Sequence, residues 1–77
     1  MANELLWFRE DGIWKRTVGD LSTWAFVRLV NGRYEVAVGT NGKPRKWEDY
    51  CDASGATANQ EYKAKRRATA LARKLLK

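Results

Sequence analysis

The chain has 77 residues, with 15 Lys and Arg, 9 Asp and Glu, one Cys and no His, so we expect a single small domain over residues 1–77 with a modest core. This composition excludes a His-based triad and a structural zinc site, and no Gly-rich phosphate loop is present, so we predict a protein that is not an enzyme and holds no cofactor or metal. No apolar run approaches the roughly 20 residues that span a bilayer. The unpaired Cys51 is typical of a reducing, cytoplasmic compartment.

Residues 5–18 predict a β-hairpin that turns at Asp11-Gly12. Because side chains alternate between the two faces of a strand, this pairing gathers indole and guanidinium groups on one face. These groups belong to Trp7, Arg9, Trp14 and Arg16. Two interpretations stay open. Such a face suits a single-stranded nucleic acid, whose bases stack on the rings while Arg binds phosphate; alternatively, the rings are core and the Arg side chains reach outward.

The clearest hairpin signal is Asn31-Gly32, which separates two alternating runs after a short connector at residues 19–22. The register pairs Arg28 with Glu35, a favourable pair of opposite charges. One face of this hairpin is uniformly apolar and is predicted to be core. It consists of Ala25, Val27, Leu29, Tyr34, Val36 and Val38.

Trp24 and Phe26 lie on the opposite, more polar face of the same hairpin, beside Arg28. Large aromatic side chains at such positions need either a further layer that covers them or a partner that docks on them. We therefore regard Trp24 and Phe26 as candidate partner-binding residues, and this outer sheet face as a candidate dimer contact.

Asn41-Gly42 predicts another turn, which leads into an edge strand because Pro44 cannot donate a ladder hydrogen bond. A strict two-residue turn would set Glu35 against Glu48, so we expect a longer or bulged connection. Trp47 is expected on the core face with the valines. The loop carries a basic cluster, Lys43, Arg45 and Lys46, followed by the acidic residues Glu48, Asp49 and Asp52, which we interpret as solvated loop.

Residues 58–77 hold seven of the 15 Lys and Arg but only one of the 9 Asp and Glu, so the whole formal charge of +6 belongs to this segment. Its composition favours a helix, and Thr57 with Gln60 has the spacing of a capping box. At about 100° per residue, a narrow apolar stripe forms on one side. The stripe contains Ala64, Ala68, Leu71, Ala72 and Leu75.

Most basic residues of this helix fall within another arc of about 120°. They are Lys63, Arg66, Arg67, Arg73, Lys74 and Lys77, with Lys65 lying apart. A charged outer face is also what an ordinary solvated helix carries, but that face usually mixes both signs. The near-absence of carboxylates favours a surface that binds a polyanion.

Strands first and one helix last predict an α+β domain, an antiparallel meander of four to five strands with the helix packed across one face. The expected strands are at about 5–9, 13–18, 23–30, 33–39 and 45–50, and the helix at about 58–76. Over residues 23–77 this order is similar to the arm-binding domains of phage integrases, a resemblance of topology that implies DNA binding in which the sheet enters the groove. The short, basic chain also looks like many small phage or mobile-element proteins.

These patterns favour a small nucleic-acid-binding protein, with DNA or RNA bound at the phosphates by the helix and the basic loop. The aromatic and Arg faces of the sheet would add base stacking or selectivity. The alternative is an inhibitor or adaptor that docks on an acidic protein through Trp24, Phe26 and the basic helix. A membrane partner is not expected, because the apolar stripe is mostly Ala and lacks the bulky side chains that insert into lipid.

Overall fold

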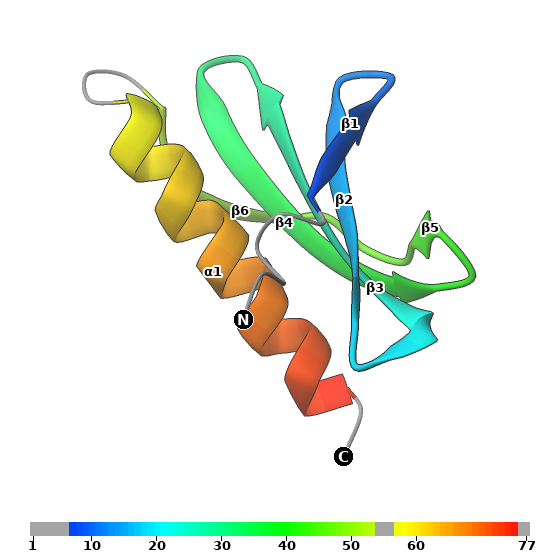
Figure 1. Cartoon of the computed structure of the whole chain (residues 1–77). Helices are drawn as coiled ribbons and strands as arrows, with labels where there is room; N and C mark the ends of the chain where they lie inside the picture. Colours follow the sequence, from blue (N-terminus) through cyan, green and yellow to red (C-terminus); the bar gives the residue numbers. More distant parts are fainter. Residues whose placement is uncertain (1–6, 54–56, 76–77) are drawn as a thin grey trace.

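The computed structural model describes residues 7–53 and 57–75, which form an antiparallel sheet with one helix laid across it (Figure 1). The elements are β1 (Phe8–Glu10), β2 (Ile13–Val18), β3 (Asp20–Val30), β4 (Arg33–Thr40), β5 (Lys43–Pro44), β6 (Glu48–Asp52) and α1 (Thr57–Leu75). Strands β1 to β5 follow one another in sequence order, and β6 also pairs with β4. The predicted α+β meander with a C-terminal helix is therefore confirmed.

The three two-residue turns determine the strand register. In each turn both residues have positive φ, as at Asn31 (52°) and Gly32 (77°). This conformation matches the natural twist of a hairpin, and Asn, Asp and Gly adopt it at little cost. The predicted pairs follow: Arg9 faces Trp14 in the first hairpin, and Arg28 faces Glu35 in the second, where their side chains form an ion pair of 2.7 Å.

The predicted connector at residues 19–22 is wrong, because β3 already begins at Asp20. Gly19 alone makes the bend with a φ of 78°, which a side chain would disfavour. The pairing of β2 with β3 shifts register between Thr17 and Val18 to accommodate this tight connection. As a result β3 is the longest strand, with 11 residues.

The main core lies between α1 and the sheet face that it covers, which we call the helix face. Ala64, Ala68 and Ala72 are each 0% exposed and recur every four residues, so one row of methyl groups meets the sheet. Small side chains let the helix axis approach closely. The sheet contributes the apolar face predicted for the central hairpin, with Val27 and Val36 fully buried.

Two residues predicted for this core are exposed. Leu29 is 52% exposed because its position on β3 lies beyond Arg28, where the pairing with β2 ends, so no β2 side chain flanks it. Leu75 is 38% exposed at the last residue of α1. The capping box also differs from expectation, since the Gln60 side chain donates to the Asp52 carbonyl at 2.8 Å rather than returning to the helix start.

The opposite side of the sheet, which we call the outer face, forms a second small core from its own side chains. Phe26 is 0% exposed. It stacks on Trp24 with ring centroids 6.3 Å apart, and Trp47 meets it edge-on at the same distance. Phe8 continues this aromatic row by an edge contact with Trp24 at 6.2 Å. The prediction that Trp47 joins the helix face is therefore wrong.

The connection between β4 and β6 is bulged, as expected, but the bulge replaces the pairing of Glu35 with Glu48 by one of Glu35 with Asp49. The register shifts between Tyr34 and Glu35, so Glu48 pairs with Val36 and Asp49 pairs with Glu35. Each facing carboxylate has its own guanidinium, since Arg28 binds Glu35 and Arg33 binds Asp49 through two hydrogen bonds of 2.7 and 2.8 Å. The acidic residues expected in a loop are thus part of an edge strand.

Candidate nucleic-acid interface

The outward surface of α1 carries five exposed basic side chains. They are Lys63, Arg66, Arg67, Arg73 and Lys74, which we call the basic surface. Lys77 lies outside the described residues. The helix is anchored by its Ala row, so the docking fixes which way these side chains point, as the sequence pattern predicted. Arg73 and Lys74 also occupy the last turn, where the helix dipole favours positive charge.

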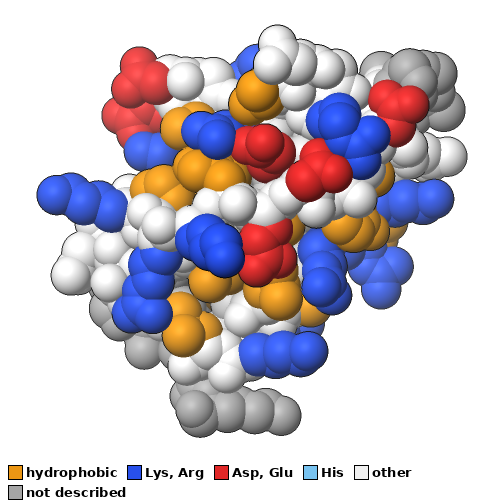
Figure 2. Space-filling view, turned by 180° about the vertical axis from the view of Figure 1, so that it is seen from behind, with side chains coloured by type: hydrophobic (Ala, Val, Ile, Leu, Met, Phe, Trp, Pro, Cys, Tyr) orange, Lys and Arg blue, Asp and Glu red, His pale blue; other side chains and the backbone are white. Residues whose placement is uncertain are grey.

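The ion pairs of the described chain lie elsewhere. Within residues 7–53 and 57–75 they join Lys15 to Glu10, Arg28 to Glu35, Arg33 to Asp49 and Lys65 to Glu61, at 2.7 to 2.9 Å. None of these pairs uses a residue of the basic surface. Seen from behind, the molecule shows red carboxylates set among blue basic side chains, with apolar groups between them (Figure 2). The basic surface is therefore the largest group of exposed cations that lie outside these ion pairs.

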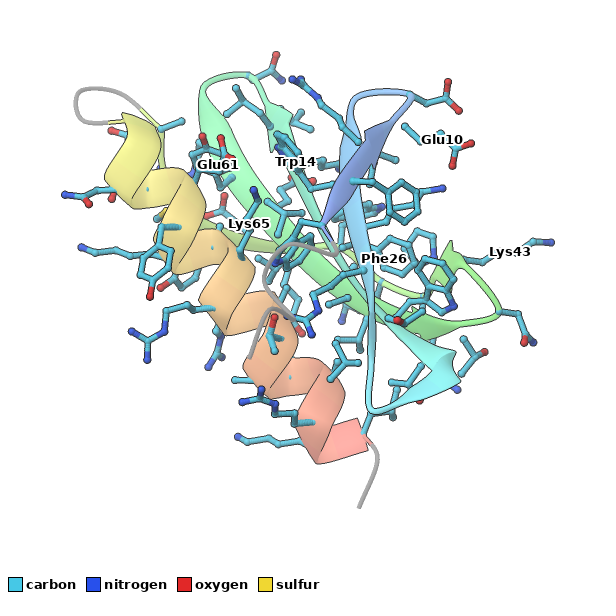
Figure 3. All side chains as sticks on the ribbon, in the orientation of Figure 1. Glu10, Trp14, Phe26, Lys43, Glu61 and Lys65 are labelled. Atoms are coloured by element: carbon cyan, nitrogen blue, oxygen red, sulfur yellow. The ribbon has the colours of Figure 1, made fainter. Side chains whose placement is uncertain are left out.

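Lys65 points from α1 toward the sheet instead of outward (Figure 3). Its ammonium lies 2.8 Å from Glu61, one helical turn earlier, and 3.9 Å from the ring centroid of Trp14. Both contacts hold the charge within the protein. The sequence pattern had already separated Lys65 from the other basic residues of the helix.

The first hairpin does not form an exposed stacking platform. Trp7 and Trp14 pack against the main core beneath α1, because Trp14 pairs with Val27 in register. The predicted cross-strand cation–π contacts are present, with Arg9 5.3 Å from the ring of Trp14 and Arg16 5.9 Å from that of Trp7. The structure supports the packing of both Trp rings against the core, but only Arg9 reaches outward as that interpretation expected, because Arg16 is buried.

Arg16 is a buried cation, only 6% exposed. Its Nε donates a hydrogen bond to the Thr17 carbonyl at 3.0 Å. A buried guanidinium retains its charge and so raises the positive potential of its surroundings even when its own donors are engaged. Among the arginines of the predicted Trp/Arg face, Arg9 is the exposed one.

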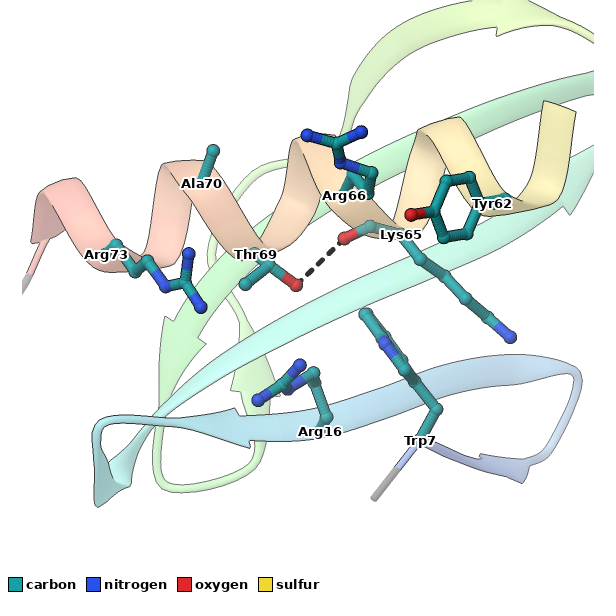
Figure 4. A pocket seen from close by; sticks show the side chains of 8 residues that line it. All are labelled: Trp7, Arg16, Tyr62, Lys65, Arg66, Thr69, Ala70 and Arg73. Carbon is teal, nitrogen blue, oxygen red and sulfur yellow. Dashed lines mark hydrogen bonds between the residues drawn. The ribbon is translucent and has the colours of Figure 1, made fainter. Parts of the chain in front are cut away.

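A cleft of about 360 Å³ runs along the junction of α1 with β2 (Figure 4). Its cationic walls come from Arg16, Lys65, Arg66 and Arg73, and its other walls from Trp7, Tyr62, Thr69 and Ala70. Among the described residues, the lining contains no carboxylate. Figure 4 shows Tyr62 and Lys65 toward one end and Arg73 at the other, with Trp7 and Arg16 on the sheet side.

Tyr62 is the functional candidate that the sequence interpretation missed. It is 57% exposed, and the guanidinium of Arg66 lies 5.8 Å from its ring centroid. The available signal was the spacing: residues four apart share a helix face, so Tyr62 had to lie beside Arg66. A smaller depression on the other side of Arg66, lined by Tyr50, Lys63, Arg66 and Arg67, has a volume of about 280 Å³.

The basic loop does not join the basic surface. Lys43, Arg45 and Lys46 are exposed, but Lys43 projects from the β5 end of the molecule, across the sheet from α1 (Figure 3). Arg28, a candidate for stacking or base contacts, is ion-paired with Glu35 and stacks over Trp47 at 4.1 Å. The candidate residues thus fall into separate groups, and α1 carries the largest.

The candidate protein-docking residues are largely covered. Phe26 is completely buried, so it cannot be an exposed anchor, and a further layer, the aromatic row, accounts for it. Trp24 is partly exposed, and its indole Nε1 is buried without a hydrogen-bond partner among the described residues. Phe8, 45% exposed, is the apolar residue that this face presents most openly. Less apolar surface is therefore left for a sheet-to-sheet dimer than the sequence suggested.

Among the described residues, the ionisable groups with shifted pKa values lie where β4 pairs with β6. Burial raises the pKa of the Cys51 thiol, which disfavours the nucleophilic thiolate. Burial likewise raises the pKa of Tyr34, whereas the hydrogen bonds from Arg33 lower the pKa of Asp49. In the described ranges no group of three or more Cys, Asp or Glu is placed to hold a metal ion. No helix there has the length and apolar character needed to cross a bilayer.

Comparisons with protein-family models, curated proteins and solved structures give no match. The likeness to phage integrase modules therefore stays a prediction based on the order of elements. The functional interpretation rests on the geometry of the chain's own residues.

Proposed function

We propose that the protein binds nucleic acid through the basic surface of α1, as a binding protein rather than an enzyme. The observation that supports this most is the set of five exposed cations on one helix, outside the ion pairs of the described chain. This array of exposed cations takes no part in the ion pairs that join the described residues. It attracts a polyanion at long range and binds its phosphates on contact.

Binding of this kind releases counterions, so the affinity should fall steeply as salt rises. The slope of log K against log salt is about −0.9 per neutralised phosphate on duplex DNA and about −0.7 on a single strand. Phosphate contacts supply affinity without reading sequence, so selectivity requires further contacts to bases. A cytoplasmic location belongs to the same proposal, because the chain's only Cys is a free thiol.

Two triple variants with equal charge change test this proposal. One changes Arg66, Arg67 and Arg73 to Gln, and its matched control changes Lys43, Arg45 and Lys46 to Gln. Both lower the net charge by three, but only the first alters α1. Binding of fluorescently labelled DNA and RNA oligonucleotides is measured by anisotropy at several salt concentrations.

The α1 variant should bind at least tenfold more weakly, with a salt slope smaller by about two to three, while the loop variant stays close to wild type. Equal losses of affinity in both variants would mean that binding depends on the net charge of the protein and not on α1. No binding by the wild-type protein at low salt would overturn the proposal. If an acidic protein binds instead with the same dependence on α1, the alternative of an inhibitor or adaptor takes its place.

A further inference from the structure

We propose that the cleft between α1 and β2 is a binding site for unpaired nucleotides, so that the preferred ligand is single-stranded nucleic acid. This inference rests on the proposed function and adds the class of ligand to it. The chemistry invoked is one aromatic ring that stacks a base beside arginines that bind the adjoining phosphates.

The cleft combines the two components that such a site requires. Tyr62 supplies an aromatic ring that is 57% exposed, and Arg66 and Arg73 supply exposed guanidinium groups within the same lining. At 1.5 Å per residue, Tyr62 and Arg73 are about 16 Å apart along the helix axis. That length suits a few consecutive nucleotides rather than a single ion.

The remaining cations of the cleft are held in place by contacts within the protein. Arg16 is bonded to the Thr17 carbonyl, and Lys65 is held by Glu61 and the Trp14 ring. Thr69 donates its hydroxyl hydrogen to the Lys65 carbonyl at 2.9 Å, which stiffens the cleft floor (Figure 4). A ligand therefore meets a preformed wall and loses little free energy in ordering it.

Arg66 links the ring to the phosphate contacts. Its guanidinium lies 5.8 Å from the centroid of Tyr62, a distance at which cation and ring attract each other. A strand that stacks a base on Tyr62 therefore has Arg66 beside its backbone and can continue along the cleft toward Arg73.

Single strands fit this geometry better than duplexes do. In a duplex the bases are stacked and paired inside, so a ring at one end of the cleft cannot stack on them. In a single strand the bases turn outward and are available for aromatic side chains. A duplex would meet only the exposed cations and gain nothing from Tyr62.

The test compares Tyr62→Ala with Tyr62→Phe and with Tyr50→Ala as a matched control. Tyr50 is the other exposed tyrosine near the basic surface and lines the smaller depression instead of the cleft. The probes are a labelled ten-nucleotide single strand of mixed sequence, as DNA and as RNA, and a blunt DNA duplex of the same length. Circular dichroism confirms that each variant is folded, as expected for exposed positions.

Tyr62→Ala should weaken single-strand binding by about 5- to 150-fold, the equivalent of one stacked base. Tyr62→Phe should restore it, since the ring and not the hydroxyl stacks. Tyr50→Ala, and all three variants on the duplex, should change affinity less than twofold. If Tyr62→Ala leaves single-strand binding unchanged, or weakens both probes equally, the cleft inference is overturned while the proposed function stands. If neither probe binds at low salt, the proposed function itself fails.

Discussion

The two faces of the sheet are both covered, but by different means. On the helix face a separate element, α1, seals the valines with a row of Ala methyl groups. On the outer face the cover comes from aromatic side chains of the sheet and its loop, because Trp24 of β3 and Trp47 of the β5–β6 connection pack on Phe26. Covering by a separate element leaves that element a second surface, and on α1 this surface carries the largest group of exposed cations outside the ion pairs of the described chain.

The charges on the two sides differ accordingly. On the outer face Arg28 is paired with Glu35 and stacks over the ring of Trp47. The arginines on the outward side of α1 lie outside the ion pairs of the described chain. The comparison shows that a basic residue indicates binding only once its local partners are known.

We expect the largest loss of stability from a substitution in the core of the outer face. Phe26→Ala removes a completely buried ring and should lower the free energy of unfolding by about 3–5 kcal/mol. This is a large share of the total free energy of unfolding of so small a domain. Phe8→Ala, in the same aromatic row but 45% exposed, is the matched control and should cost much less. Urea denaturation measures both. Similar losses in the two variants would mean that the row is not a core.

A smaller effect should follow on the helix face from overpacking. Ala68→Leu forces three extra carbon atoms into a contact with no exposed area and should destabilise the domain by about 1–3 kcal/mol. Ala70→Leu makes the same change two residues along, on the exposed side of α1, and should leave stability nearly unchanged. Thermal melting followed by circular dichroism compares them. A tolerated Ala68→Leu would mean that the helix does not sit close to the sheet.

The smallest effect concerns the ion pair at the β6 edge. Hydrogen bonds from Arg33 lower the pKa of Asp49, so the folded state favours the ionised carboxylate. The ion pair therefore stabilises the folded state at pH values above the ordinary Asp pKa of about 3.9. This stabilisation is lost as the pH falls through the lowered pKa of Asp49. Wild type should melt slightly higher than Asp49→Asn at pH 6, and the two should converge near pH 2. A melting difference that does not change with pH would contradict this assignment, and Arg33→Gln should remove the same pH dependence.

Local signals in the sequence predicted the strand pairing well. Asp11-Gly12 and Asn31-Gly32 set the turns, and once a turn is set the register of both strands follows residue by residue. The helix and the direction of its charge followed from its periodicity, and Lys65 was separated from the basic arc on the same grounds. These features depend on residues that are close in the chain.

What could not be predicted depends on how distant parts of the sheet meet. Alternation assigned Phe26 to the outer face but could not say whether Trp47 would reach across to cover it, because the loop after Pro44 sets no register. Leu29 had the right periodicity for the core but lies past the end of its neighbouring strand. The cleft depended on the same kind of information, since it requires knowing that Trp7 and Arg16 lie beneath Tyr62.

The order of the elements also has a consequence for biosynthesis. Each of β1 to β5 pairs with a strand that directly precedes or follows it, and hairpins of this kind form in about 1–10 μs. At about 5–20 residues per second, the 19 residues of α1 take on the order of one to four seconds to translate. During that interval Val27 and Val36 have no cover, and a nascent sheet with bare valines is open to aggregation. The arrival of α1 ends this exposure, so the helix that gives the protein its charge also closes its most vulnerable surface.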